Sequence, residues 1–195
     1  MGLARIVWAG ALVGGACAIG VASRRGHDGA EVDRELFELL NRGHGPDADA
    51  FFMGVTELGS LYAAGAAAAT FVAVGERRAA VRAGLAAATT WGLLQAIKKL
   101  VDRPRPSDAD PATTRLLVAR PMETSWPSSH PAVLTTFTRV ATRELGVGAL
   151  GRTVASGLDL VVAASRVYLG VHYPSDVASG LLLGRAIAAV WPRSR

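Results

Sequence analysis

Apolar segments separated by short polar connections run through the whole sequence. Residues 6–23 and 58–75 each form a run of eighteen positions without a formal charge, and a third, shorter charge-free run covers residues 83–97. A run of that length can cross a bilayer as a helix. Residues 30–42 differ, because leucine and valine recur there at helical spacing between charged residues. That pattern predicts a short amphipathic helix lying along the membrane interface.

Three further segments, at 126–145, 147–169 and 176–191, are apolar but contain charged residues. The whole pattern predicts an all-α fold, namely a polytopic membrane helical bundle of about six transmembrane helices plus the short amphipathic helix. We expect residues 1–195 to form a single membrane-embedded domain. A soluble helical bundle is the structural alternative.

The first apolar run also has features of a signal peptide. Arg5 precedes it, and the small residues Ala16, Cys17 and Ala18 could form a cleavage site. Eighteen residues are long for the apolar core of a cleaved signal, so we favour a retained helix.

Composition excludes a disordered chain and disfavours a nucleic-acid-binding protein. The 195 residues are 50% hydrophobic and only 19% charged, which is too apolar for a disordered chain. The formal net charge of +5 would suit a nucleic-acid partner, but a mean hydropathy of +0.29 favours lipid instead. Cys17 is the only cysteine, so the sequence allows no internal disulfide and no cysteine-based metal site.

Candidate chemistry is concentrated after residue 97, around a long polar connection at 102–124. Lys98 and Arg105 follow the third apolar run, where cations usually anchor a helix at the interface. Beyond the connection, the segment 127–130 (Pro-Ser-Ser-His) opens the fourth helix. Unpaired backbone N–H groups in such a first turn, together with the helix dipole, form a site for an anion. A serine-rich cap with a structural histidine is the alternative.

A third cluster, within residues 165–176, contains Arg166, His172 and Asp176. His172 and Asp176 are four residues apart, so the carboxylate can accept the imidazole Nδ1–H and leave Nε2 free. A histidine oriented in this way can act as a nucleophile or a base. Arg166 supplies a guanidinium fork for phosphate oxygens.

Taken together, the three clusters resemble the signatures of the type 2 phosphatidic acid phosphatase superfamily: Lys-x6-Arg-Pro, Pro-Ser-Gly-His and Ser-Arg-x5-His-x3-Asp. The matching positions are Lys98, Arg105 and Pro106 in the first, Pro127, Ser128 and His130 in the second, and Ser165, Arg166, His172 and Asp176 in the third. Ser129 stands where the family pattern has glycine. The resemblance covers roughly residues 98–176, which we expect to be the motif-bearing core of the domain.

The resemblance implies metal-free covalent catalysis without a cofactor. His172 would attack phosphorus and form a phosphohistidine, while Asp176 would orient its ring. His130 would protonate the leaving oxygen and then activate water. The implied phosphate-binding residues are Lys98, Arg105, Ser128, Ser129 and Arg166. Charge positioned around the phosphate oxygens supplies most of the catalytic benefit in such reactions.

The resemblance also implies a substrate from the bilayer, a lipid or polyprenyl phosphate or diphosphate, and no nucleic-acid partner. Phosphatidate, phosphatidylglycerol phosphate, undecaprenyl diphosphate and a polyprenyl-phosphoryl sugar phosphate stay open, as does the oligomeric state. The alternatives are a lipid phosphotransferase with the same intermediate, a catalytically silent scaffold that binds lipid phosphate, and a soluble acid phosphatase or vanadium haloperoxidase relative. We expect a multi-pass plasma-membrane protein whose catalytic face is extracytoplasmic, as is usual in the family, although basic residues fall on both faces.

Charged residues also occur inside the last three predicted helices. A rise of about 1.5 Å per residue places Asp159, Arg139 and Arg185 at a similar depth, on the order of 10–14 Å below the site. Charges within a membrane are costly unless they are paired. We therefore expect Asp159 to bridge to Arg185 or Arg139, the alternative being that these charges lie at an interface.

Overall fold

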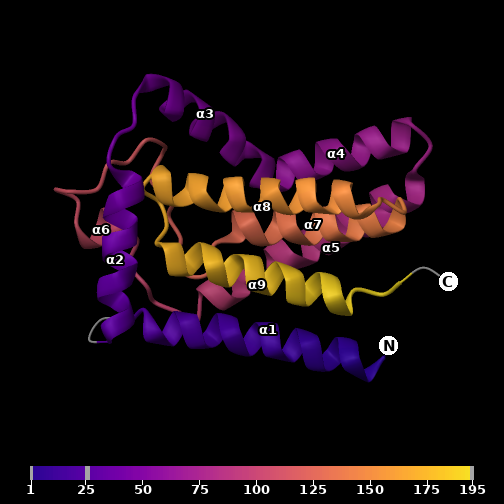
Figure 1. Cartoon of the computed structure of the whole chain (residues 1–195), viewed down its shortest axis with the longest axis horizontal. Coiled ribbons are helices and arrows are strands. Elements are labelled where there is room, and N and C mark those ends of the chain that lie inside the picture. The colour runs from indigo at the N-terminus through magenta and orange to yellow at the C-terminus, as the bar shows by residue number, and fades with distance from the viewer. Residues whose placement is uncertain (1, 25–26, 194–195) are drawn as a thin grey trace.

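The structure, a computed structural model, describes residues 2–24 and 27–193, and these residues form helices joined by turns and loops, with no strand among them (Figure 1). The helices are α1 (Leu3–Ala22), α2 (Asp28–Asn41), α3 (Pro46–Thr56), the 3₁₀ turn η1 (Glu57–Gly59), α4 (Leu61–Ala73), α5 (Arg77–Lys98), α6 (Pro106–Ala109), α7 (Ser129–Glu144), α8 (Ala149–Tyr168) and α9 (Pro174–Val190). The predicted all-α class is confirmed for these residues.

Helix α7 forms the centre of the bundle and packs against α5, α8 and α9, while α1 lies along α9 (Figure 1). Small side chains make the contacts close. Ala83 and Ala87 of α5 pack against Val133 of α7, and all three are buried. At Gly184 of α9 a Cβ would lie 2.6 Å from the carbonyl oxygen of Ala132, so α7 and α9 approach at a distance that only glycine allows. Close backbone approach of this kind is typical of helices that associate in lipid.

The amphipathic helix predicted at 30–42 is α2, which crosses one end of the bundle in Figure 1. Its residue Asn41 is buried, and its side-chain Nδ2 donates to the backbone oxygens of Tyr168 at 2.8 Å and Arg115 at 2.9 Å. The Arg115 backbone N–H donates back to Asn41 Oδ1 at 2.8 Å. These bonds fix α2 and the long polar connection to the end of α8.

The prediction of one helix over residues 58–75 is wrong at its start. The chain turns through η1 before α4 begins at Leu61, and the Ser60 hydroxyl caps α4 by accepting a hydrogen bond from the Ala63 backbone N–H at 3.0 Å. Helix α3, which the apolar pattern does not predict, precedes this turn. The segments Pro46–Gly59 and Leu61–Ala73 bend by 66° at the break.

The count of six membrane spans is not confirmed. Within residues 2–24 and 27–193, α1 is the one helix long and apolar enough to cross a membrane, and the bent segment from α3 to α4 becomes a second if it is a single span. The other predicted spans correspond to α5, α7, α8 and α9, all of which contain arginine. Helix α5 starts at Arg77 instead of residue 83, and α7 starts at Ser129 instead of residue 126.

Asp159 does not form the ion pair predicted from depth alone. It is fully buried in α8, and its Oδ1 accepts a hydrogen bond from the Thr138 hydroxyl of α7 at 3.1 Å. In the part of the chain that the structure describes, no contact of 4.0 Å or less joins its carboxylate to Arg139 or Arg185, although both lie within electrostatic range. A neutral hydroxyl from the neighbouring helix takes the place of the expected direct partner.

Candidate active site

Ends of four helices meet at the end of the bundle that α2 and α6 cover (Figure 1). Lys98 is the last residue of α5, His130 lies in the first turn of α7, Arg166 lies in the last turn of α8, and Asp176 lies in the first turn of α9. The buried members of this set are Lys98, Arg105, Ser128, Arg166, His172 and Asp176. Residues far apart in sequence therefore share one polar region inside an apolar bundle.

The His172 ring lies between a cation and a carboxylate. Its Nε2 is 3.2 Å from the Arg105 guanidinium, and its Nδ1 is 3.5 Å from Asp176 Oδ2. A guanidinium can only donate, so Nε2 accepts and the neutral ring carries its proton on Nδ1. Burial lowers the pKa of His172 well below its usual value, and the charges of Arg105 and Lys98 act in the same direction. The structure thus favours a neutral ring with an Nε2 lone pair.

Asp176 is held by more partners than the sequence pattern predicts. Its Oδ2 accepts hydrogen bonds from the Ser125 hydroxyl at 2.5 Å and from the Tyr173 backbone N–H at 2.9 Å. The Ser125 oxygen also lies 3.5 Å from His172 Nδ1. The separation between the imidazole and the carboxylate is long for a direct hydrogen bond, and the Ser125 hydroxyl contacts both groups.

Arg103 links the same carboxylate to α2. One guanidinium nitrogen donates to Asp176 Oδ1 at 2.5 Å and to the Ser175 hydroxyl at 2.7 Å, and the other donates to Asp33 Oδ2 at 2.6 Å. Asp33 also accepts from the backbone N–H of Ser175 at 2.8 Å. The guanidinium lies over the Tyr173 ring, 4.6 Å from its centroid. Arg103 is thus a bridge between two buried carboxylates.

The remaining cations are arranged by backbone carbonyl groups and one hydroxyl. Lys98 Nζ donates to the Thr124 carbonyl at 3.0 Å, and Arg105 donates to the Glu123 carbonyl at 2.8 Å. Arg166 donates through one terminal nitrogen to the Thr56 hydroxyl at 2.8 Å. Burial, the largest cause, lowers the pKa of Arg105 from its ordinary value. Carbonyl and hydroxyl oxygens carry no formal charge, so these partners do not neutralise the three cations. The cations are therefore suited to binding an oxyanion.

Two polar atoms at this site are buried without a hydrogen-bond partner. They are the hydroxyl oxygen of Ser128, just before α7, and Nε of Arg166. Buried polar groups are normally satisfied, so an unpartnered donor next to a cluster of cations indicates a place for an anionic ligand. The neighbouring Ser129 hydroxyl instead donates to Gln95 at 3.4 Å, a long contact, so its side chain has a protein partner.

His130 lies near the other site groups and is half-buried. Arg166, His172, Lys98 and Arg105 all lie within its electrostatic range. Gly59 of η1 packs directly on it, because a Cβ at Gly59 would be 2.8 Å from His130 Cβ and 2.8 Å from Val162 Cγ1. The chain at the bend before α4 therefore packs against His130 and restricts its position.

The site combines three cations and two imidazoles with unpartnered donors, and that set is suited to a phosphate-sized oxyanion. Among the described residues, no group of three or more histidine, cysteine, aspartate or glutamate side chains could hold a metal ion. The arrangement can place a neutral imidazole nitrogen beside an anion surrounded by positive charge.

The model of the PAP2 superfamily matches residues 79–195, more than half of the chain. The chain therefore belongs to the PAP2 superfamily, which confirms the resemblance seen in the three clusters.

Curated relatives are phosphatases by name. Decaprenylphosphoryl-5-phosphoribose phosphatase of Mycobacterium tuberculosis is 38% identical over 118 residues, which are 58% of this chain and 60% of that protein. Undecaprenyl-diphosphatase of Sulfolobus acidocaldarius is 39% identical over 77 residues, covering 38% of this chain and 35% of that protein. The alignments thus span about 60% or less of the length of these relatives.

Two solved structures share the fold. Aquifex aeolicus LpxE matches with a TM-score of 0.71 and 26% identity, over 79% of this chain and 90% of that chain. The transmembrane PAP2-type phosphatidylglycerolphosphate phosphatase of Bacillus subtilis matches with a TM-score of 0.73 over 92% of this chain and 91% of that chain, and at 21% identity it bears on the fold alone. The helical bundle is therefore that of membrane PAP2 proteins.

Sequence reasoning missed three residues that contact the site. Ser125 and Arg103 lie inside or beside the recognised clusters, but no motif position marks them. Asp33 is 142 residues from its partner Ser175, and its own neighbourhood reads as an ordinary amphipathic helix. Asp33 lies with Phe37 and Asn41 on the buried face of α2, whereas the leucines and the valine that define the apolar pattern are exposed, so that pattern does not mark Asp33.

Proposed function

We propose that the chain is a membrane phosphatase that hydrolyses a lipid or polyprenyl phosphate, without a metal, through a phosphohistidine at His172. The observation that carries this proposal is the Nε2 atom of a buried, neutral His172, 3.2 Å from Arg105 in a region of positive charge. The unpartnered Ser128 hydroxyl and Arg166 Nε support a phosphate at the same place.

In the first step, the Nε2 lone pair of His172 forms a bond to phosphorus while the bond from phosphorus to the leaving oxygen breaks. His130 gives its proton to that oxygen, which departs as an alcohol, or as a phosphate from a diphosphate. Lys98, Arg105 and Arg166 bind the equatorial oxygens, where positioned charge lowers the barrier most. Asp176, with Ser125, holds the Nδ1–H and stabilises the positive phosphoimidazole ring.

In the second step, a water oxygen attacks phosphorus and His130 takes the proton released. The bond between phosphorus and Nε2 breaks, inorganic phosphate leaves, and His172 returns to its neutral form. Ser128 and the backbone N–H groups around Ser129 donate to the phosphate oxygens in both steps. Each proton and electron pair is thus returned to its starting place after one turnover.

The relatives favour a polyprenyl-linked substrate for this site. One relative is named for decaprenylphosphoryl-5-phosphoribose and another for undecaprenyl diphosphate, and both names give a long isoprenoid lipid with a terminal phosphate. A site at the end of a membrane bundle can take such a phosphate from the interface while the tail stays in the bilayer. We place this end on the extracytoplasmic side of the plasma membrane.

The test is a phosphate-release assay on detergent-solubilised full-length protein, with chelator present. The panel contains a polyprenyl-phosphoryl sugar phosphate, undecaprenyl diphosphate, phosphatidylglycerol phosphate and phosphatidate, and His172→Ala is the blank. We expect release from the polyprenyl substrates and none from the blank. Release by the His172→Ala variant at the wild-type rate, or product that forms only when an acceptor alcohol is added, would contradict hydrolysis at this site.

A further inference from the structure

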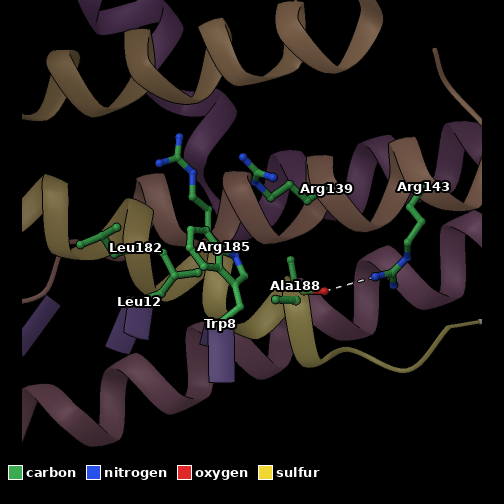
Figure 2. Close-up of a pocket in the computed structure, with 8 residues that line it drawn as sticks. Trp8, Leu12, Arg139, Arg143, Leu182, Arg185 and Ala188 are labelled. Carbon is green, nitrogen blue, oxygen red and sulfur yellow. Dashed lines mark hydrogen bonds between the residues drawn. The ribbon is translucent and has the colours of Figure 1, made fainter. Parts of the chain in front are cut away.

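A hollow lies between α1, α7 and α9, in the half of the bundle away from the catalytic end. Its volume is about 500 Å³. Its lining includes Trp8 and Leu12 of α1, Arg139 and Arg143 of α7, and Leu182 and Arg185 of α9 (Figure 2). Arg185 follows Asp176 by nine residues along α9, which places it about 14 Å from the catalytic end. The mechanism above uses none of these residues.

Two of these arginines have no partner close enough to neutralise them. Within residues 2–24 and 27–193, neither Arg139 nor Arg185 makes a side-chain hydrogen bond or an ion pair, and Nε of Arg185 is buried without any partner. Figure 2 shows both guanidinium groups extending to the same side of the hollow, and each lies within electrostatic range of the other. Two like charges that face one space repel, so an anion between them would stabilise both.

The protein itself supplies little negative charge at this place. Asp159 lies within electrostatic range of both guanidinium groups, but its carboxylate accepts from Thr138 and forms no direct ion pair with them. Arg143 has an ion pair with Glu144 at 3.5 Å, and its terminal nitrogen donates to the Ala188 carbonyl at 3.2 Å. The hollow therefore keeps an excess of positive charge.

Apolar side chains border the same hollow and open it to the bilayer. Trp8 is 60% exposed, and Leu182 is half-buried. Tryptophan favours the membrane interface, where its ring spans the boundary between headgroups and acyl chains. Cations beside an apolar wall at that level match a ligand that has an anionic head and a hydrocarbon tail. Basic pockets between transmembrane helices bind such headgroups in other membrane proteins.

We propose that this hollow binds one anionic phospholipid, its phosphate held between Arg139 and Arg185 and its acyl chains lying beside Trp8 and Leu182. The ligand is a phosphodiester lipid such as phosphatidylglycerol, which stays intact because its phosphate is not terminal. The site is distinct from the catalytic one and lies on the opposite half of the bundle. A bound lipid there would fix α1 against α7 and α9.

Trp8 provides the probe for a test. The full-length protein carrying His172→Ala, so that turnover plays no part, is titrated in detergent with bromine-labelled phosphatidylglycerol or bromine-labelled phosphatidylcholine. Bromine quenches tryptophan fluorescence at short range, and the signal of Trp8 is isolated by subtracting a Trp8→Phe sample. We expect half-maximal quenching at a phosphatidylglycerol concentration about 10- to 30-fold below that of phosphatidylcholine, as two arginine contacts imply.

Matched variants separate the site from general attraction to charge. The double variant Arg139→Gln/Arg185→Gln is expected to lose the preference, and the charge-retaining Arg139→Lys/Arg185→Lys to keep most of it. Arg152→Gln removes an exposed arginine at the same end of the bundle, whose side chain donates only to the Val147 carbonyl, and is expected to change nothing.

Three outcomes would overturn the proposal. They are equal quenching by the two lipids, a preference that survives in the glutamine double variant, and displacement by free glycerol phosphate at the same molar concentration as the lipid. The last outcome would mean a site for small anions only. Because His172→Ala is inactive under the proposed function, the result is independent of whether the chain is a phosphatase.

Discussion

Arg103 is the residue whose replacement tests most sharply how the Asp176 carboxylate is held. The change is Arg103→Gln, which keeps a side chain of similar reach but removes the charge. In the structure it removes the donor to Asp176 Oδ1 at 2.5 Å and the donor to Asp33 Oδ2 at 2.6 Å. Asp176 would then keep the bonds from Ser125 and Tyr173 to Oδ2 but lose the one that holds Oδ1, so the carboxylate could tilt relative to the His172 ring, which lies 3.5 Å away.

The size of the effect follows from the bond that is lost. A hydrogen bond to a charged group contributes about 1.5–3 kcal/mol, and each 1.36 kcal/mol is a factor of about ten in rate. If that contribution acts on the orientation of Asp176, kcat should fall about 10- to 150-fold while KM changes by less than about threefold. Arg103→Lys keeps one charge but cannot reach both carboxylates as a fork, so it should recover part of the rate.

The assay is steady-state phosphate release, run as a double-mutant cycle with Asp176→Asn. If Arg103 acts through Asp176, Arg103→Gln should cost little in the Asp176→Asn background. Arg120→Gln is the control, since Arg120 lies in the same connection and pairs with Asp108 at 2.6 Å on an exposed surface. If Arg103→Gln lowers kcat equally in the wild-type and the Asp176→Asn backgrounds, the reasoning is refuted. It is also refuted if the kcat of Arg103→Gln returns to the wild-type value on cooling, because the loss would then come only from unfolding.

Two further predictions concern the histidines. Because the pKa of His172 is lowered, its ring stays neutral in the free enzyme as the pH falls through about 6.5. After correction for substrate ionisation, kcat/KM should therefore begin to fall only below that pH. A fall in kcat/KM with its midpoint at or above about pH 6.5 would contradict a buried neutral nucleophile. Gly59→Ala places a Cβ 2.8 Å from both His130 Cβ and Val162 Cγ1, so displacement of His130 should lower kcat by about 10²-fold. Gly54→Ala, with nothing within 4 Å of its added Cβ, should keep the wild-type kcat, and a matching loss there would remove the case for a specific contact.

Much of the candidate site could be predicted from the sequence because its residues occupy helix ends. Apolar periodicity located α2, α8 and α9 to within about two residues, and the polar interruptions mark where those helices stop. Residues such as Lys98 and Asp176 lie at such ends, so the bundle brings them together once its helices pack. The spacing of His172 and Asp176 likewise predicted that the imidazole and the carboxylate would be neighbours.

The remaining features depend on contacts that a local pattern does not carry. Asp33 joins the site only because α2 crosses the end of the bundle and meets Ser175, a partner 142 positions away. Depth along the helices predicts an arginine partner for Asp159, but depth does not give the rotation about the helix axis, and the Thr138 hydroxyl faces Asp159 instead. The break at η1 is not predicted because residues 58–75 contain no charge, and the Ser60 hydroxyl that caps α4 there is a single polar group within that apolar run.

The central claim is that His172 becomes covalently phosphorylated. The most direct measurement is rapid acid-free quenching of the purified protein after mixing with substrate labelled with ³²P in its terminal phosphate, followed by peptide mapping. Because His130 acts in both steps, the labelled substrate carries a leaving group that departs without protonation, such as p-nitrophenol. The His130→Ala variant, which cannot activate water, should then accumulate the label. We predict label that survives alkali, is lost in acid, and maps to His172. Turnover by the wild-type protein with no label on His172 in either protein would contradict the account.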